Sequence, residues 1–131
     1  MVGIVIVSHS SKIADGITDL TAQIASAHKG IIAAGGMEDG EIGTDAVRIS
    51  EAVKKANDGD GVVILADLGS GIMSAETAIE LLDGEDINVK LADAPIVEGA
   101  IAAAVTAVCG QNLEAVIAAA EQTRAVKKIN S

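Results

Sequence analysis

Residues 4–7 form an unbroken run of isoleucine and valine, and this run ends in Ser8-His9-Ser10-Ser11. A continuous β-branched run without polar alternation is typical of a strand buried on both faces of a parallel sheet. In such sheets, ligands and chemistry gather at the carboxyl ends of the strands. We therefore expect His9 to lie at the functional edge of the sheet.

Short apolar segments alternate with helical patterns along the rest of the chain. Further strands are expected over residues 30–34, 62–66 and 88–92, with a helix between each strand and the next. This alternation predicts an α/β fold, a three-layer sandwich in which helices cover both faces of a mainly parallel sheet. Right-handed crossovers and the common strand order 2-1-3-4 would make the first and third strands neighbours. The 131 residues suit one core, so we expect a single domain over residues 1–131.

Capping residues and apolar spacing predict the limits of the helices. Ser10 or Ser11 is expected to cap the first helix, and His28 would complement the helix dipole in its last turn. Thr44 is predicted to cap the second helix and Asn112 the last one. The apolar residues of the first helix that we expect to face the sheet are spaced three or four apart: Ile13, Ile17, Leu20 and Ile24.

Composition narrows the classes of function. Half of the residues are apolar, yet the chain has no Phe, Trp or Tyr. Recognition of single-stranded nucleic acid is therefore disfavoured, because it relies on aromatic stacking platforms. The formal net charge of −10 also disfavours nucleic acids and anionic membranes, since both would be repelled. A protein partner with a basic or mixed-charge surface is the expectation that remains.

Cysteine content and apolar runs bear on the compartment. The single cysteine, Cys109, has no partner within the chain for a disulfide, and we expect it to be a small core residue. The N-terminus lacks the basic start of a signal peptide, and the apolar stretch over residues 96–108 is interrupted by Glu98. These features predict a cytoplasmic protein without a membrane-spanning helix.

His9 and the turn after the third strand carry the chemistry that we expect. A neutral histidine is a covalent nucleophile, and a carboxylate bound to one ring nitrogen leaves the lone pair of the other nitrogen free. Asp67 would orient His9 in this way if the two strand ends meet. Donors for a phosphoryl group would then come from hydroxyl and main-chain N–H groups of Ser8, Ser10, Gly69, Ser70 and Gly71. A structural histidine and an ordinary Gly-Ser-Gly turn are the alternative interpretation.

Residues 35–43 form a loop with four glycines and three acidic residues near the same expected edge. Gly35, Gly36 and Met37 begin this loop, and we expect them to contact a partner. A solvated turn without a role explains the composition equally well. His28 is expected to be structural.

Other classes of site can be weighed on the same residues. Gly69-x-Gly71-x-x-Ser74, with Asp93 further along, partly matches a dinucleotide-binding fingerprint but lacks the third small residue. The turn has no Gly-Lys-Ser/Thr sequence of an ATPase and no Gly-x-Ser-x-Gly elbow of a serine hydrolase, although spacing leaves other triads open. Metal-binding side chains do not recur at ligand spacing, so no metal site is expected.

Six motifs together carry a family resemblance. They are SHSS at 8–11, AAGG at 33–36, DGEIGTDA at 39–46, DLGSG at 67–71, SAETAIELL at 74–82 and DAPIVEGA at 93–100. In this order they resemble the phosphotransfer subunits of PTS-dependent dihydroxyacetone kinases. That family is in turn similar to the mannose-type enzyme IIA domains.

The resemblance implies a phosphocarrier subunit of a phosphoenolpyruvate-dependent dihydroxyacetone phosphotransferase. His9 would accept a phosphoryl group from the histidine phosphocarrier protein and pass it to ADP on a partner kinase subunit. The ATP formed there would phosphorylate dihydroxyacetone on a third subunit. Asp67 matches the family's orienting aspartate, no cofactor is implied, and the family is typically homodimeric. Some members carry fused donor domains, which we expect to be separate proteins here. An enzyme IIA domain of a mannose-type sugar transporter, a module that senses phosphorylation state, and a nucleotide-binding protein remain the alternatives.

Overall fold

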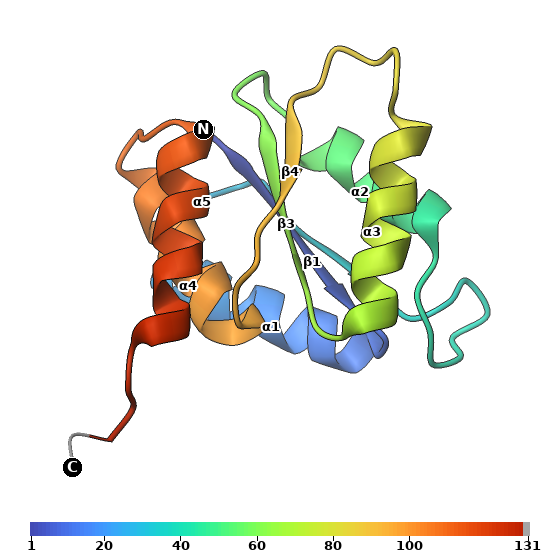
Figure 1. The fold of residues 1–131 in the computed structure, drawn as a ribbon, viewed down its shortest axis with the longest axis horizontal. Coiled ribbons are helices and arrows are strands. Elements are labelled where there is room, and N and C mark those ends of the chain that lie inside the picture. The colour runs from blue at the N-terminus through green and yellow to red at the C-terminus, as the bar shows by residue number, and fades with distance from the viewer. Residues whose placement is uncertain (130–131) are drawn as a thin grey trace.

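The computed structural model describes residues 1–129, in which a four-stranded sheet lies between two layers of helices (Figure 1). The strands are β1 (Gly3–Ser8), β2 (Ile31–Gly35), β3 (Val62–Ala66) and β4 (Val89–Leu91). The helices are α1 (Ser11–Ile24), α2 (Ala46–Ala56), α3 (Gly69–Leu81), α4 (Ile96–Val108) and α5 (Leu113–Gln122), followed by a short 3-10 helix, η1 (Thr123–Ala125).

The strand order is β2-β1-β3-β4, and every pairing is parallel. This confirms the predicted α/β class and the order 2-1-3-4. β1 is a central strand, and all six of its residues are buried, as its unbroken apolar run predicts. In the register, Val7 lies opposite Ala66 on β3, and Ser8 lies opposite Gly35 on β2. The ends of β1 and β3 are therefore level with each other.

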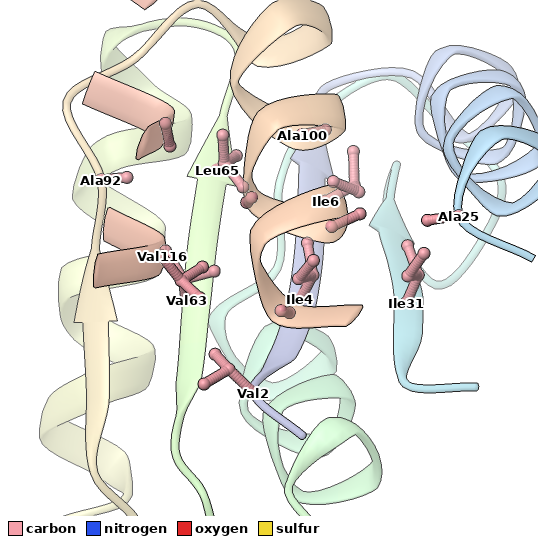
Figure 2. Packing of buried hydrophobic residues seen from close by; sticks show 14 of the residues in the cluster. Val2, Ile4, Ile6, Ala25, Ile31, Val63, Leu65, Ala92, Ala100 and Val116 are labelled. Atoms are coloured by element: carbon pink, nitrogen blue, oxygen red, sulfur yellow. The ribbon is translucent and has the colours of Figure 1, made fainter. Parts of the chain in front are cut away.

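Each face of the sheet has its own core. Ile4 and Ile6 of β1 point into the cluster formed with α1, α4 and α5 (Figure 2), whereas Val5 and Val7 point into the cluster formed with α2 and α3. Alternate residues of one strand thus pack on opposite layers. Alanine supplies much of both clusters, which fits a chain without aromatic residues.

The buried face of α1 differs from the predicted one. Ile13, Leu20 and Ile24 are exposed, and the residues buried against the sheet are Ala14, Ile17 and Thr21. The reason is a close approach between α1 and β2: a Cβ added to Gly35 would lie only 2.6 Å from that of Ala14. A helix this close to the sheet presents small residues, and its larger apolar residues are turned aside.

His28 also differs from the prediction. α1 ends at Ile24, so His28 lies beyond the helix and does not complement its dipole. Its imidazole is buried, with Nε2 2.7 Å from the carbonyl oxygen of Val2, while Nδ1 accepts from the N–H of Gly30 at 2.9 Å. Burial is the main cause that lowers the pKa of His28, and the positive N-terminus adds to it; the Val2 carbonyl and Asp58 oppose this shift. The ring is a neutral structural link between two chain segments.

The capping predictions are confirmed at two helices and wrong at one. Ser10 caps α1 and Asn112 caps α5, each through a side-chain oxygen that accepts a main-chain N–H. α2 is capped by Asp45 and not by Thr44, whose hydroxyl is directed to α3. Cys109 follows α4 and is exposed, so it is not the core residue that we expected.

Within the part of the chain that the structure describes, no helix combines the length and the apolar character needed to cross a bilayer.

Candidate functional site

The site lies where β1 and β3 end and α1 and α3 begin. These two strands are neighbours, and in Figure 1 both run toward the same edge of the sheet before their helices start. His9 follows β1 directly, and Asp67 follows β3. The predicted convergence of the two residues is therefore present in the structure.

Asp67 is bonded to His9 and its neighbours through both carboxylate oxygens. Oδ1 lies 2.9 Å from Nδ1 of His9 and accepts the N–H of Leu68 at 2.8 Å. Oδ2 accepts the hydroxyl of Ser8 at 2.9 Å and the main-chain N–H of His9 at 3.1 Å. Since the carboxylate accepts hydrogen bonds from both the main-chain N–H and the ring of His9, it fixes the position and rotation of the imidazole.

The electrostatics of Asp67 favour its ionised form. Partial burial is the largest single influence and raises the pKa of this carboxyl, but the bonds from His9, Ser8 and Leu68 outweigh it. The pKa of Asp67 therefore lies below its ordinary value. An ionised Asp67 accepts a hydrogen bond from the N–H at Nδ1 of His9. In the neutral ring, the lone pair is then on Nε2.

Nε2 of His9 faces the first turn of α3, where it is hydrogen-bonded to the hydroxyl of Ser70. The His9 side chain is 21% exposed, so the ring is supported on one side and accessible on the other. With Nδ1 held by Asp67, Nε2 is the ring nitrogen available for chemistry.

The beginning of α3 is built differently from the beginnings of three other helices. Side chains cap α1, α2 and α5, whereas Leu68 precedes α3 and no side chain bonds to its first N–H groups. Gly69 and Gly71 leave this turn without a Cβ on either side of Ser70. The open turn and the positive end of the helix dipole suit an anion beside Nε2.

Gly71 is packed against the His9–Asp67 pair. A Cβ added there would lie 3.1 Å from Oδ1 of Asp67 and 3.7 Å from Cε1 of His9. An added Cβ at Gly69 would meet nothing within 4 Å. Of these two predicted site glycines, Gly71 is thus the one where a side chain would crowd the His9–Asp67 pair.

Two of the predicted phosphoryl donors, the Ser8 hydroxyl and the Ser10 main-chain N–H, are already bonded within the protein. Ser8 is fully buried, and its hydroxyl donates to Asp67, so this donor supports the carboxylate and does not face the open side of His9. The hydroxyl oxygen of Ser10 accepts the N–H of Ile13 as the cap of α1, and its own N–H donates to Ser8. Ser70 is the predicted hydroxyl that lies on Nε2.

The predicted partner loop is placed beside the site, but of the three residues predicted to contact a partner only Met37 is exposed. Gly35 and Gly36 are buried against the start of α1, where an added Cβ on Gly35 would come within 2.8 Å of the carbonyl oxygen of Ser10. Met37 is 37% exposed and begins the accessible part of the loop. The surface available to a partner therefore starts at Met37.

Thr44 is a neighbour of the site that the sequence did not indicate. Its hydroxyl lies 2.6 Å from that of Ser74 and 3.5 Å from the carbonyl oxygen of Ser70, while the N–H of Gly43 donates to the carbonyl of His9 at 2.8 Å. The loop before α2 is thereby tied to both halves of the site. Thr44 and Ser70 are 26 residues apart, and no local pattern signals such a contact.

The chemistry that this geometry supports is nucleophilic attack by Nε2, with the developing anion held at the beginning of α3. No group of three or more His, Cys, Asp or Glu side chains suited to a metal ion is found among the described residues.

Comparisons with known proteins define the class. The sequence model of the family described as the PTS system fructose IIA component matches residues 3–119. The chain is 42% identical over 132 residues to the phosphoryl donor subunit DhaM of the PEP-dependent dihydroxyacetone kinase of Providencia stuartii, which covers 98% of this chain and 28% of that protein. It is 40% identical to the corresponding subunit of dihydroxyacetone kinase 2 of Listeria innocua, over 89% of this chain and 94% of that protein.

A solved structure has the same fold. The crystal structure of EF1359, a protein of unknown function, superposes with a TM-score of 0.83 at 34% identity, over 99% of this chain and 100% of that one. By the family model that matches residues 3–119, the chain belongs to the IIA components of the phosphotransferase system, and its fold is that of the solved relative.

Within this class, the chain belongs to the family of dihydroxyacetone kinase phosphoryl donor subunits. It spans little more than a quarter of the length of the Providencia relative and nearly the full length of the Listeria one.

Proposed function

We propose that the chain is a phosphohistidine carrier of a PEP-dependent dihydroxyacetone kinase. His9 accepts a phosphoryl group from the histidine phosphocarrier protein and passes it to ADP on a partner kinase subunit. The observation that carries this proposal is the bond between Nδ1 of His9 and Asp67, which leaves Nε2 as the ring nitrogen that faces the beginning of α3, a helix without a side-chain cap. The names of the relatives from Providencia stuartii and Listeria innocua supply the substrate system.

The bonding pattern supports phosphoryl transfer to Nε2. The incoming phosphorus takes the position of the Ser70 hydroxyl on the Nε2 lone pair, and the N–H groups at the beginning of α3 donate hydrogen bonds to the phosphoryl oxygens. Asp67 stabilises the positive charge that the ring gains as the N–P bond forms. When that bond breaks on transfer to ADP, the ring returns to its neutral form and can accept again.

The partner chemistry follows from the same proposal. Both the donor and the ADP-bearing subunit must reach Nε2, so each approaches the edge that Met37 and the start of α3 share. We also propose that residues 1–131 act as one domain within a homodimer, as the family resemblance implies.

The test is a stepwise transfer. The protein is incubated with labelled phosphoenolpyruvate, enzyme I and the phosphocarrier protein, and then with the ADP-loaded kinase subunit. Dihydroxyacetone and the subunit that binds it are added last. An acid-labile phosphate on His9 is expected, absent from His9→Ala, discharged by the kinase subunit and followed by formation of dihydroxyacetone phosphate. A phosphate on another residue, or a phosphohistidine that the kinase subunit leaves intact, contradicts the proposal.

A second candidate is the IIA domain of a sugar transporter, which the description of the matching family model favours. It shares the phosphohistidine and differs in the acceptor. Discharge of His9 by a transporter IIB domain, without discharge by the kinase subunit, would establish this alternative.

A further inference from the structure

Ser70, His9 and Asp67 form a chain of hydrogen bonds that the phosphocarrier role does not require. The Ser70 hydroxyl contacts Nε2 of His9, and Nδ1 of the same ring lies 2.9 Å from Asp67. In the neutral ring with its proton on Nδ1, Nε2 carries a lone pair, and the hydroxyl of Ser70 donates to it. This is the arrangement of nucleophile, base and orienting carboxylate in the serine triad, which is recognised by geometry and not by the order of residues along the chain.

We propose that Ser70 is an activated nucleophile in the unphosphorylated protein and that it is acylated by small activated esters. This activity goes beyond the proposed phosphoryl transfer, in which the Ser70 hydroxyl only leaves Nε2 and does not react. The base is the same nitrogen that would accept the phosphoryl group. Acylation and phosphorylation are therefore mutually exclusive.

The surroundings of Ser70 supply the remaining parts of an acyl-transfer site. Ser70 is exposed in the first turn of α3, directly after a strand of the parallel sheet, so an ester can reach its hydroxyl. The N–H groups of this turn are not bonded to any capping side chain and can bind the oxyanion that forms on the carbonyl oxygen. The lowered pKa of Asp67 keeps the carboxylate charged at neutral pH, and its charge stabilises the imidazolium.

The step balances as an ordinary acyl transfer. The Ser70 oxygen attacks the ester carbonyl while its proton moves to Nε2, and collapse of the tetrahedral intermediate breaks the bond to the alcohol, which takes that proton. The product is acyl-Ser70. A water that gives its proton to Nε2 then attacks the acyl group, releases the carboxylic acid and restores the serine hydroxyl.

The test uses p-nitrophenyl acetate as the probe with the whole protein. Release of nitrophenol is followed by absorbance, and the acetylated residue is located by mass spectrometry of peptides. We expect one acetyl group on Ser70 and no acetylation of this position in Ser70→Ala. Loss of the base in His9→Gln should lower the rate of Ser70 acetylation about 100-fold, and Asp67→Asn should lower it by about tenfold or more.

Ser11→Ala is the matched control, because Ser11 lies two residues from His9, is exposed, and makes no hydrogen bond to the ring among the described residues. It should be acetylated on Ser70 as fast as the parent protein. Prior phosphorylation of His9 with phosphoramidate, a reagent that needs no partner protein, should abolish acetylation of Ser70. Acetyl groups found on His9 alone, or ester hydrolysis that is unchanged in Ser70→Ala, would show simple imidazole catalysis and overturn the proposal.

This experiment is independent of the transfer assay. Acylation of Ser70 in a protein that the phosphocarrier protein cannot phosphorylate would contradict the proposed function and leave this inference standing. Phosphorylation of His9 in a protein whose Ser70 does not react would support the proposed function and contradict this inference.

Discussion

Replacing Gly71 by alanine tests whether the position of Asp67 controls the reactivity of His9. The substitution removes no polar group from the site. Its new Cβ would lie 3.1 Å from Oδ1 of Asp67, about 0.3 Å short of the 3.4 Å at which ordinary van der Waals contact begins. If the carboxylate moves away by this amount, its 2.9 Å contact with Nδ1 of His9 approaches the outer limit for an N–H···O bond, about 3.2 Å.

The size of the effect follows from that displacement. A misplacement of about 1 Å in a catalytic group costs roughly 100-fold in rate, so a shift of about 0.3 Å should cost about fourfold, or roughly 1 kcal/mol. The folding free energy should change little, because alanine is preferred to glycine in a helix by about 0.5–1 kcal/mol and this gain offsets the crowding. We therefore expect slower phosphorylation of His9 in a protein that is as stable as the parent.

The assay measures the initial rate of His9 phosphorylation by the phosphocarrier protein and, separately, unfolding in urea. Gly16→Ala is the matched control, since Gly16 lies within α1 and an added Cβ meets nothing within 4 Å. It should raise stability by about 0.5–1 kcal/mol and leave the rate unchanged. Equal rates in Gly71→Ala and Gly16→Ala would refute the argument that contact with Asp67 limits the position of His9.

Three further changes test other contacts of the site and fold. Asp67→Asn removes the charge that stabilises the His9 imidazolium, so the phosphorylation rate should fall by about 100-fold or more. The free energy of unfolding in urea should fall by about 1.5–3 kcal/mol. A phosphorylation rate within a factor of two of the parent would contradict this role. Thr44→Val removes the hydroxyl bonded to Ser74, so it should slow phosphorylation a few-fold and lower the free energy of unfolding by about 0.5–1.5 kcal/mol. Thr44→Ser keeps a hydroxyl and should restore both the rate and the stability. If serine does not restore them, the effect of valine comes from packing. Because the pKa of His28 is lowered, the unfolded chain binds a proton at a higher pH than the folded protein does. The free energy of unfolding should therefore decrease as pH falls below about 6.5 and level off below the folded pKa. The same pH dependence in His28→Gln would exclude this histidine as its source.

The sequence predicted the parts of the fold that depend on runs and alternation. The apolar run before His9 identified a fully buried central strand, and the repeated strand and helix pattern gave the order in which β1 and β3 are neighbours. The meeting of His9 and Asp67 follows from that order, because parallel strands that pair in register end at the same edge.

Contacts set by three-dimensional packing were the ones that sequence patterns missed. The spacing of Ile13, Leu20 and Ile24 correctly indicates one stripe on a helix, but the close approach of α1 to Gly35 decides that the neighbouring stripe of small residues is buried. Thr44 was expected to cap α2, yet Asp45 takes that position and frees the Thr44 hydroxyl to reach α3. Both errors arise because local spacing shows which residues share a face and not which face the rest of the chain covers.

Asp67 supports both the fold and the chemistry of the site, so the stability of the folded protein depends on this carboxylate in acid. The carboxylate accepts hydrogen bonds from Ser8 and from the main chain of His9 at the end of β1. It therefore connects the ends of β1 and β3 and also holds the imidazole. Its pKa lies below the ordinary value in the folded protein, so its contribution to stability is complete above the unfolded pKa of about 3.8 and is lost as pH falls through the folded pKa. Protonation at that point also removes the charge that supports the imidazolium. Loosening of the strand ends should therefore occur as Asp67 takes up its proton in acid, because this carboxylate is bonded to Ser8 and to the main chain of His9.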